Sequence, residues 1–292
     1  MERSIITRDG LTLWTEAFGD PADPAILLIM GGTAQGIVWP DELCWMFADS
    51  ACHVVRFDHR DTGRSSKCEY GYDLSALAED AADVITGLGL APAHVVGQSV
   101  GGMAAQLLAL HHPVLVRSLV LLSSSPDANG DVNLPPVSGL PGPLRPMLDL
   151  AAALTVNPPA TREARLEAAV AGWRVLVGPA APFREPYWRD LVERAMRRAP
   201  EPDTAGQHLR ALDRTPPLTA RIAGIRVPTL VVHGGQDPVF PVEHGSELVR
   251  AIAGARLVEI AGLGHIFPPE WSATIHALVL EHLRQVESRR PW

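Results

Sequence analysis

Residues 97–101 have the sequence Gly-Gln-Ser-Val-Gly, which places Ser99 between two glycines. A β-branched pair, Val95-Val96, precedes them, and a helix-forming run, residues 103–110, follows them. A strand that turns into a helix within one or two residues strains the backbone of the turn residue and lifts its side chain clear of the sheet. Flanking glycines avoid the crowding that a Cβ would cause. The pattern predicts a nucleophilic Ser99; the alternative is an unreactive serine in an ordinary strand–helix turn.

A serine nucleophile needs a general base, and His265 is the first candidate for that role. It ends the sequence Gly-Leu-Gly-His, residues 262–265, which directly follows the last expected strand. The two glycines would let this loop fold back until the imidazole reaches Ser99. The alternative is a loop histidine without a catalytic role. Four other histidines are weaker rivals for the base. His233 falls within an expected strand, His276 and His282 fall in a C-terminal helical segment, and the fourth is His244.

The base needs a carboxylate that fixes its tautomer, and Asp237 follows the preceding strand in the sequence Gly-Gly-Gln-Asp-Pro. An aspartate before proline is also common in simple turns. Asp127, which follows an earlier strand, is the competing acid. We favour Asp237 because its short glycine-rich turn can hold a carboxylate under the imidazole. The chain order Ser99, Asp237, His265 is the order that accompanies a nucleophile on a strand–helix turn.

Two backbone N–H groups could bind the negative charge that develops on the carbonyl oxygen of a substrate. One belongs to Val100, which opens the helix after Ser99, and the other to Gly32, in the glycine pair that ends an apolar strand. A plain glycine turn is the alternative for Gly32. Residues 58–65 are dense in charge, and we interpret them as a hydrogen-bonded loop that supports the same end of the sheet.

These candidate residues follow short apolar segments of the kind that form buried strands. Such runs alternate with helical patterns at residues 25–30, 53–57, 94–96, 118–122, 229–233 and 256–260. Continuous apolar strands between helices predict an α/β fold with a doubly wound, mostly parallel sheet covered on both faces. The carboxyl ends of parallel strands share one edge, so this fold would bring the candidate residues together. Residues 11–14 predict part of an antiparallel hairpin at the sheet edge.

One segment lacks any strand pattern. Residues 126–215 hold half of the chain's 26 prolines, with helical stretches at residues 144–154, 161–177 and 187–198 between them. We predict a helical cap, residues 126–215, inserted into an α/β core formed by residues 1–125 and 216–292. The alternative is a set of long surface loops, which compact domains tolerate poorly.

Composition excludes several classes of function. The net charge of −8 and the lack of a basic block argue against a nucleic-acid partner. No leader peptide or membrane-spanning run is visible, which predicts a cytoplasmic protein that does not enter membranes. The three cysteines are odd in number and lack metal-ligand spacing, so we expect reduced thiols, no metal and no cofactor. The sequence leaves the oligomeric state open.

Taken together, these segments resemble the α/β-hydrolase family over nearly the whole chain. Within that family the sequence is most similar to the aclacinomycin methylesterases, which tailor anthracyclines. The stretches that carry this similarity are residues 18–25, 39–42, 58–65, 93–97, 139–143 and 173–176. The resemblance implies Ser99, Asp237 and His265 as a catalytic triad, with Gly32 and Val100 as oxyanion donors. The sequence departs from the relatives at Val100, where an unbranched apolar residue is more usual.

These observations predict a serine carboxylic ester hydrolase that acts on a sizeable apolar small molecule. The resemblance implies that methyl esters of aromatic polyketides are the first substrates to test. Large apolar side chains in the cap and near the triad could line the pocket, although cap–core packing would account for part of them. The candidates are Met147, Trp173, Phe183, Tyr187, Trp188, Phe240, Ile266 and Phe267. The alternatives are a tailoring enzyme that uses the same triad for cyclisation, acyl transfer, lactone opening or C–C cleavage, and a ligand-binding receptor on the same fold.

Overall fold

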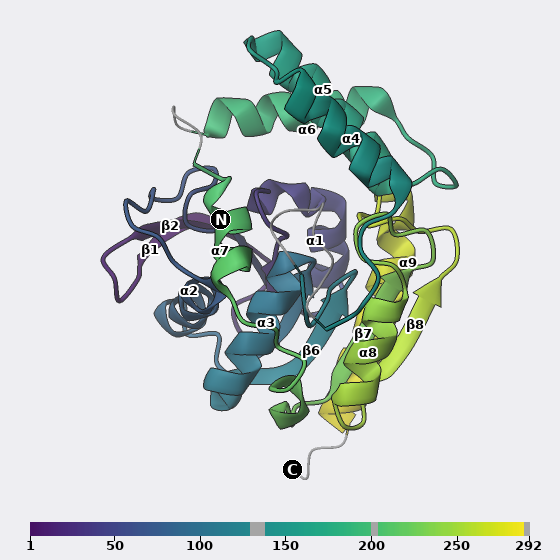
Figure 1. Ribbon diagram of the computed structural model, residues 1–292. Helices are drawn as coiled ribbons and strands as arrows, with labels where there is room; N and C mark the ends of the chain where they lie inside the picture. The colour runs from purple at the N-terminus through teal and green to yellow at the C-terminus, as the bar shows by residue number, and fades with distance from the viewer. Residues whose placement is uncertain (129–137, 200–203, 289–292) are drawn as a thin grey trace.

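The computed structural model describes residues 1–128, 138–199 and 204–288. Its centre is an eight-stranded sheet with the strand order β1-β2-β4-β3-β5-β6-β7-β8 (Figure 1). The bounds are β1 Glu2–Ile6, β2 Thr12–Phe18, β3 Ala25–Ile29, β4 His53–Phe57, β5 Ala93–Gln98, β6 Val116–Leu122, β7 Thr229–Gly234 and β8 Arg256–Ile260. The pairs β1/β2 and β2/β4 are antiparallel and every other pair is parallel. The predicted sheet and edge hairpin are confirmed.

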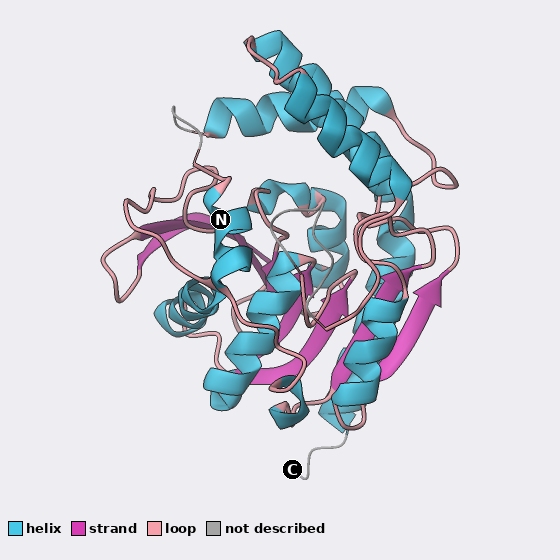
Figure 2. Ribbon diagram, viewed as in Figure 1, coloured by secondary structure: helices cyan, strands magenta, loops and turns pink. Residues whose placement is uncertain are grey.

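Successive side chains of each central strand serve opposite faces of the sheet. In β3, Leu27 and Ile29 join one apolar cluster, while Ile26 and Leu28 join the other. This period of two explains why the strands are apolar throughout, since both faces are covered. Figure 2 shows the helices packed on either side of the strands.

The helices that cover the sheet divide between its two faces. The cluster that contains Leu27 includes side chains from α2 (Leu74–Gly87), α3 (Val100–His111) and α8 (Glu243–Ala251). The opposite cluster includes side chains from α1 (Asp41–Ala48) and α9 (Ser272–Ser288). Short 3₁₀ turns lie at Gly36–Val38, Pro113–Leu115, Ile222–Gly224 and Pro269–Trp271.

Three helices arch over the end of the core at which β5 turns into α3 (Figure 1). They are α4 (Arg145–Val156), α5 (Arg162–Val177) and α6 (Glu185–Arg198), and each lies within two residues of a stretch expected to be helical. A fourth helix of the expected cap, α7 (Gln207–Arg214), instead places Ala211 and Leu212 in the apolar cluster of α2 and α3. Residues 129–137 and 200–203 of the expected cap lie outside the described residues.

The far end of the arch is tied to the core by Arg198, at the end of α6. Its guanidinium donates to the buried carboxylate of Asp58 at 2.8 Å and to the side-chain carbonyl of Gln35 at 3.0 Å. Asp58 also accepts the backbone N–H groups of Gly36 and Arg64. The charged loop at residues 58–65 is therefore a hydrogen-bonded support for this end of the sheet, as the sequence indicates.

Candidate active site

Ser99 occupies the turn between β5 and α3 in a conformation that few residues other than glycine adopt. Its φ is 54° and its ψ is −123°. The turn requires glycine neighbours, since a Cβ on Gly97 would lie 2.5 Å from the carbonyl oxygen of Gly101, and one on Gly101 would collide with Ile29. Such a strained turn persists only where surrounding structure holds it, and here the hydroxyl of Ser124 donates to the carbonyl of Ser99 at 2.8 Å.

A continuous chain of hydrogen bonds joins Ser99 to His265 and Asp237. The hydroxyl oxygen of Ser99 lies 2.9 Å from Nε2 of His265, and Nδ1 of His265 lies 2.8 Å from Oδ2 of Asp237. The other carboxylate oxygen accepts the backbone N–H groups of Val239 and Phe240 at 2.8 and 2.9 Å. A carboxylate held this way fixes the imidazole with Nδ1 protonated, which leaves Nε2 free to accept a proton from the hydroxyl.

The rival residues are engaged elsewhere. His233 bonds through Nε2 to the carbonyl of Phe240 at 2.7 Å, and burial lowers its pKa. His244 lies between the hydroxyl of Ser125 and the carbonyl of Pro141. Asp127, the competing acid, accepts the backbone N–H of Ser138 at 2.6 Å. The structure thus brings Asp237, rather than Asp127, against His265.

The loop of His265 is fixed by two contacts that the sequence analysis missed. The backbone N–H of His265 donates to the carbonyl of Leu176 in α5 at 2.7 Å. Its carbonyl accepts the side-chain amide of Gln98, the residue before Ser99, at 2.8 Å. Gly264 is required at this approach because a Cβ there would collide with Leu176. The glycines of the Gly-Leu-Gly-His loop were the one available signal, and they do not identify the partners.

Two backbone N–H groups beside Ser99 are free to bind an anion. Within the described ranges, neither the N–H of Gly32 nor that of Val100 has a hydrogen-bond acceptor. Val100 opens helix α3, so its N–H also carries the positive end of the helix dipole. Gly32 lies against it, since a Cβ on Gly32 would come 2.9 Å from the side chain of Val100. The two residues that carry these N–H groups therefore pack against each other.

A cavity of about 360 Å³ opens above these groups. Ser99, His265 and Gly32 form its floor, and residues of the cap helix α5 form much of its wall. Its lining is mostly apolar: Met30, Gly31, Gly32, Thr33, Ala34, Gln98, Ser99, Ala169, Gly172, Trp173, Leu176, Val239, His265 and Ile266. A site of this size and character suits a small apolar molecule with one reactive polar group.

Residues 24–270 match the family model of the α/β-hydrolase fold. The chain belongs to the α/β-hydrolase fold family. Rhodomycin D methylesterases of Streptomyces peucetius and of Streptomyces sp. strain C5 are 37% and 38% identical to it, and each alignment covers 97% of this chain and 99% of the relative. A solved structure of a hydrolase from Pseudomonas aeruginosa matches with a TM-score of 0.75 at 26% identity, covering 97% of this chain and 98% of that one. The family resemblance seen in the sequence is confirmed.

Of the large side chains expected at the pocket of this hydrolase, Trp173 and Ile266 line the cavity. The remaining six are not part of its lining: Met147, Phe183, Tyr187, Trp188, Phe240 and Phe267. Phe240 packs edge-on against the ring of His265, with centroids 5.4 Å apart. Phe267 packs against Trp39 in the core. Met147 lies half-buried on α4.

The aromatic residues of the cap pack on one another instead. Trp188 is buried and stacks between Trp173 and Phe183, at centroid distances of 5.1 and 5.9 Å, while Tyr187 meets it edge-on. The guanidinium of Arg174 covers Phe183 at 4.2 Å. This stack gives Trp173, the member that reaches the cavity, a rigid backing.

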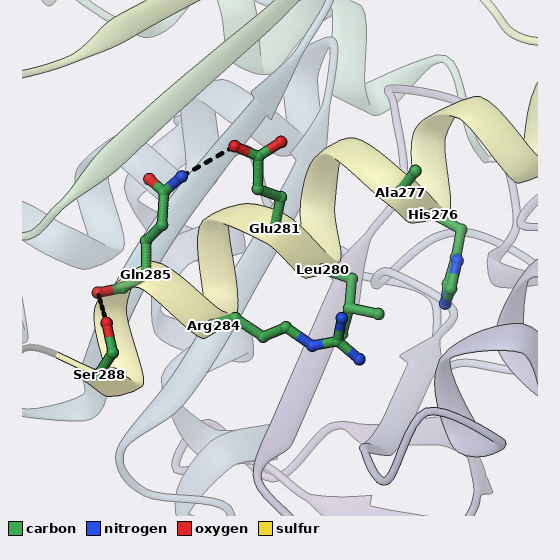
Figure 3. A pocket seen from close by; sticks show the side chains of 7 residues that line it. All are labelled: His276, Ala277, Leu280, Glu281, Arg284, Gln285 and Ser288. Atoms are coloured by element: carbon green, nitrogen blue, oxygen red, sulfur yellow. Dashed lines mark hydrogen bonds between the residues drawn. The ribbon is translucent and has the colours of Figure 1, made fainter.

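A second hollow lies along α9 and differs sharply from the first (Figure 3). It is an open groove lined by His276, Ala277, Leu280, Glu281, Arg284, Gln285 and Ser288. The polar groups drawn there serve the helix itself, since Gln285 donates to Glu281 at 2.8 Å and Ser288 donates to the carbonyl of Gln285. His276 bonds to Ser50, whose hydroxyl also donates to the carbonyl of Met46. None of these lining residues is a strained nucleophile, and we assign no catalytic role to the groove.

In the part of the chain that the structure describes, no three His, Cys, Asp or Glu side chains gather in a way that could hold a metal ion. The three cysteines are buried free thiols, and burial raises the pKa of Cys52 to about 11 and that of Cys44 to about 12. None of the helices in the described ranges is both long and apolar enough to cross a bilayer.

Proposed function

We propose that this α/β-hydrolase is a serine carboxylic ester hydrolase. The observation that carries the proposal is the hydrogen-bonded chain Ser99–His265–Asp237, with separations of 2.9 and 2.8 Å, in which Ser99 and His265 line one cavity together with Gly32. A nucleophile, a base, an orienting carboxylate and an oxyanion site are the parts that acyl transfer through a serine requires. Here all four lie within one site.

The reaction begins when the hydroxyl oxygen of Ser99 attacks the ester carbonyl while Nε2 of His265 takes its proton. The N–H groups of Gly32 and Val100 bind the oxyanion of the tetrahedral intermediate. The carbon–oxygen bond to the alcohol then breaks, and His265 returns the proton to the leaving alkoxide. Water, deprotonated by the same histidine, attacks the acyl-enzyme and releases the acid and Ser99.

The substrate that the cavity suits is an ester with an apolar acyl part and a small alcohol. Most of the lining is apolar, and Trp173 offers a flat surface for a ring system. Similarity to two rhodomycin D methylesterases over 97% of the chain supports methyl esters of aromatic polyketides as the substrate class. The small-molecule ester is the only partner that this mechanism needs.

Product analysis tests the proposal directly. The purified protein is incubated with methyl esters of aromatic polyketides and with short aliphatic methyl esters, in water enriched in oxygen-18. We expect methanol release, one labelled oxygen in the product acid, and higher kcat/KM for the polycyclic esters. An unlabelled product would point to cyclisation or transfer instead of hydrolysis. Binding without turnover would point to a receptor, and preference for the aliphatic esters would contradict the substrate class.

A further inference from the structure

Two buried histidines that the mechanism does not use lie beside the loop that carries Gly32. His59 lies on the loop after β4, and His208 lies on α7, and both side chains are fully buried. Their rings meet edge to face, with centroids 5.4 Å apart. Burying two adjacent imidazoles is costly unless their nitrogens are hydrogen-bonded; three of the four are bonded, and Nδ1 of His59 has no partner among the described residues.

Both histidines bond to the backbone of the Gly32 loop. Nε2 of His59 lies 2.8 Å from the carbonyl of Met30, just before the glycine pair. Nδ1 of His208 lies 2.9 Å from the backbone N–H of Thr33, just after it. Thr33 has a φ of 63°, a conformation that a β-branched residue adopts only when its surroundings impose it. The two bonds therefore bracket Gly31 and Gly32.

The partners fix the tautomer of each ring. A carbonyl only accepts, so Nε2 of His59 carries the proton, and burial lowers the pKa of His59 to about 3, which keeps the ring neutral. A backbone N–H only donates, so Nδ1 of His208 is the unprotonated nitrogen. Nε2 of His208 then donates to the carbonyl of Arg60 at 2.9 Å. His208 thus joins the Gly32 loop to the charged loop at residues 58–65.

The bonds settle which N–H of this loop is available to a substrate. The N–H of Thr33 is occupied by His208, and the N–H of Ala34 contacts the carbonyl of Gly31 at 3.4 Å. The N–H of Gly32 is left without an acceptor among the described residues, and Gly32 packs against the side chain of Val100. Rotation of the peptide between Gly32 and Thr33 would break the bond to His208 and tilt the neighbouring peptide that bears the Gly32 N–H.

We propose that His59 and His208 are positioning residues that hold the N–H of Gly32 in the orientation required to bind the oxyanion. The proposal rests on the proposed function of this site as an ester hydrolase. Neither histidine touches the substrate, and both act through the peptide groups on either side of the glycine pair. His208 belongs to α7, which packs with the core. This helix therefore positions the oxyanion site although His208 and Thr33 are 175 residues apart in the sequence.

A pair of substitutions at His208 separates positioning from stability. His208→Asn keeps an acceptor where Nδ1 lies and loses the donor to Arg60, whereas His208→Gln reaches Arg60 and leaves the N–H of Thr33 without an acceptor. Each variant loses one buried hydrogen bond, so their losses of stability should be similar. We expect kcat for an activated ester to stay within about 3-fold of wild type in His208→Asn and to fall about 10- to 100-fold in His208→Gln, with KM nearly unchanged in both.

A second pair at His59 tests the other side of the loop. His59→Gln keeps a donor near the Nε2 position, and His59→Asn does not reach the carbonyl of Met30. The same split is expected, with kcat retained in His59→Gln and lowered about 10-fold or more in His59→Asn. The affinity for an arylboronic acid, which forms a tetrahedral adduct with the serine, should fall in parallel with kcat because that adduct also needs the oxyanion donors.

Each outcome decides the matter. Equal kcat within either pair, or a fall in kcat that follows melting temperature across all four variants, would overturn the proposal. A His208→Asn protein that does not fold would also overturn it, because the need for a histidine at this position would then be explained by the bond to Arg60 that stabilises the fold. A wild-type protein that hydrolyses no ester would contradict the proposed function itself, before any histidine is changed.

Discussion

Strand β5 has a serine, a histidine and a carboxylate in contact near each of its two ends. At the carboxyl end lie Ser99, His265 and Asp237, the Ser99 trio. Near the amino end Ser118 lies 2.7 Å from Nδ1 of His94, and Nε2 of His94 lies 3.2 Å from Glu287, the Ser118 trio. Each trio combines a serine, a histidine and a carboxylate, which is an aspartate in the first and a glutamate in the second, and the contacts are of similar length. The two trios differ in everything that surrounds them.

The backbone and the solvent access of the two serines differ most. Ser99 has a φ of 54°, lines the cavity and faces two free N–H groups, whereas Ser118 lies within β6 and is 0% exposed. The carboxylates differ as well. Asp237 accepts two backbone N–H groups besides its bond to His265, with His233 3.6 Å away, while Glu287 is shared with the guanidinium of Arg117 at 3.0 Å.

A hydrogen bond between a serine and a histidine is therefore not sufficient to make the serine a nucleophile. The strained turn presents the hydroxyl, the helix N-terminus and the glycine loop supply the oxyanion site, and the cavity admits the ester. The Ser118 trio lacks each of these. It joins β5, β6 and α9, with Ser118 and His94 buried and Glu287 partly exposed, and its contribution is to stability.

The largest effect should separate the two serines. Ser99→Ala removes the nucleophile and should lower kcat/KM for an activated ester by about four orders of magnitude or more. Ser118→Ala, the matched control, should leave kcat/KM within about 3-fold and lower the melting temperature slightly. Steady-state kinetics on the folded proteins measure both. Comparable losses of activity in the two variants would erase the distinction between the trios.

The carboxylates should separate by a smaller margin. Asp237→Asn lets the imidazole adopt the wrong tautomer and should lower kcat by about two to four orders of magnitude. Glu287→Gln and Asp127→Asn should cost far less, because neither side chain contacts His265. The same ester assay compares the three variants. Retained activity in Asp237→Asn with loss in Asp127→Asn would move the carboxylate to the earlier strand.

The cavity wall is another feature that the Ser99 trio has and the Ser118 trio lacks. Trp173→Leu removes the flat surface and should raise KM for a polycyclic ester about 10-fold, with little change for a small acetate ester. Phe183→Leu is the control, because Phe183 belongs to the same aromatic stack and does not line the cavity. Equal effects of the two substitutions on KM would show that the stack, rather than the wall, governs binding.

The Ser118 trio should affect how the unfolding free energy depends on pH, and it should not affect turnover. Burial lowers the pKa of His94 to about 4, whereas the unfolded chain binds that proton below about 6.5. The contribution of a neutral His94 is therefore complete above pH 6.5 and is lost as the pH falls toward 4. Between pH 7 and pH 5 the wild type should lose about 2 kcal/mol more of its unfolding free energy than His94→Gln, measured by urea denaturation. Equal losses would contradict the burial of a neutral imidazole.

Much of the fold and of the Ser99 trio was predictable because the signals are local. Short apolar runs between helical patterns mark the strands, and the runs at residues 53–57 and 256–260 coincide with β4 and β8. Gly97 and Gly101 mark the turn because any Cβ there collides with backbone. His265 and Asp237 were found because side chains that follow adjacent parallel strands meet at one edge.

The rest depends on how distant segments dock. Phe183, Tyr187 and Trp188 were expected at the pocket because aromatic residues can line one, but they pack on one another, and sequence spacing does not tell which face of a cap helix turns inward. The bond from Gln98 to the carbonyl of His265 joins residues 167 positions apart. A polar residue beside a nucleophile carries no sign of such a partner.

The most direct test of the central claim is covalent labelling by a fluorophosphonate, which reacts only with an activated serine nucleophile. The wild type, Ser99→Ala and Ser118→Ala are treated under the same conditions, and the adduct is mapped by peptide mass spectrometry. We predict one phosphonyl group on Ser99 in the wild type and in Ser118→Ala, and no adduct in Ser99→Ala. A wild type that resists the probe, or an adduct that persists in Ser99→Ala, would contradict the assignment of Ser99 as the nucleophile.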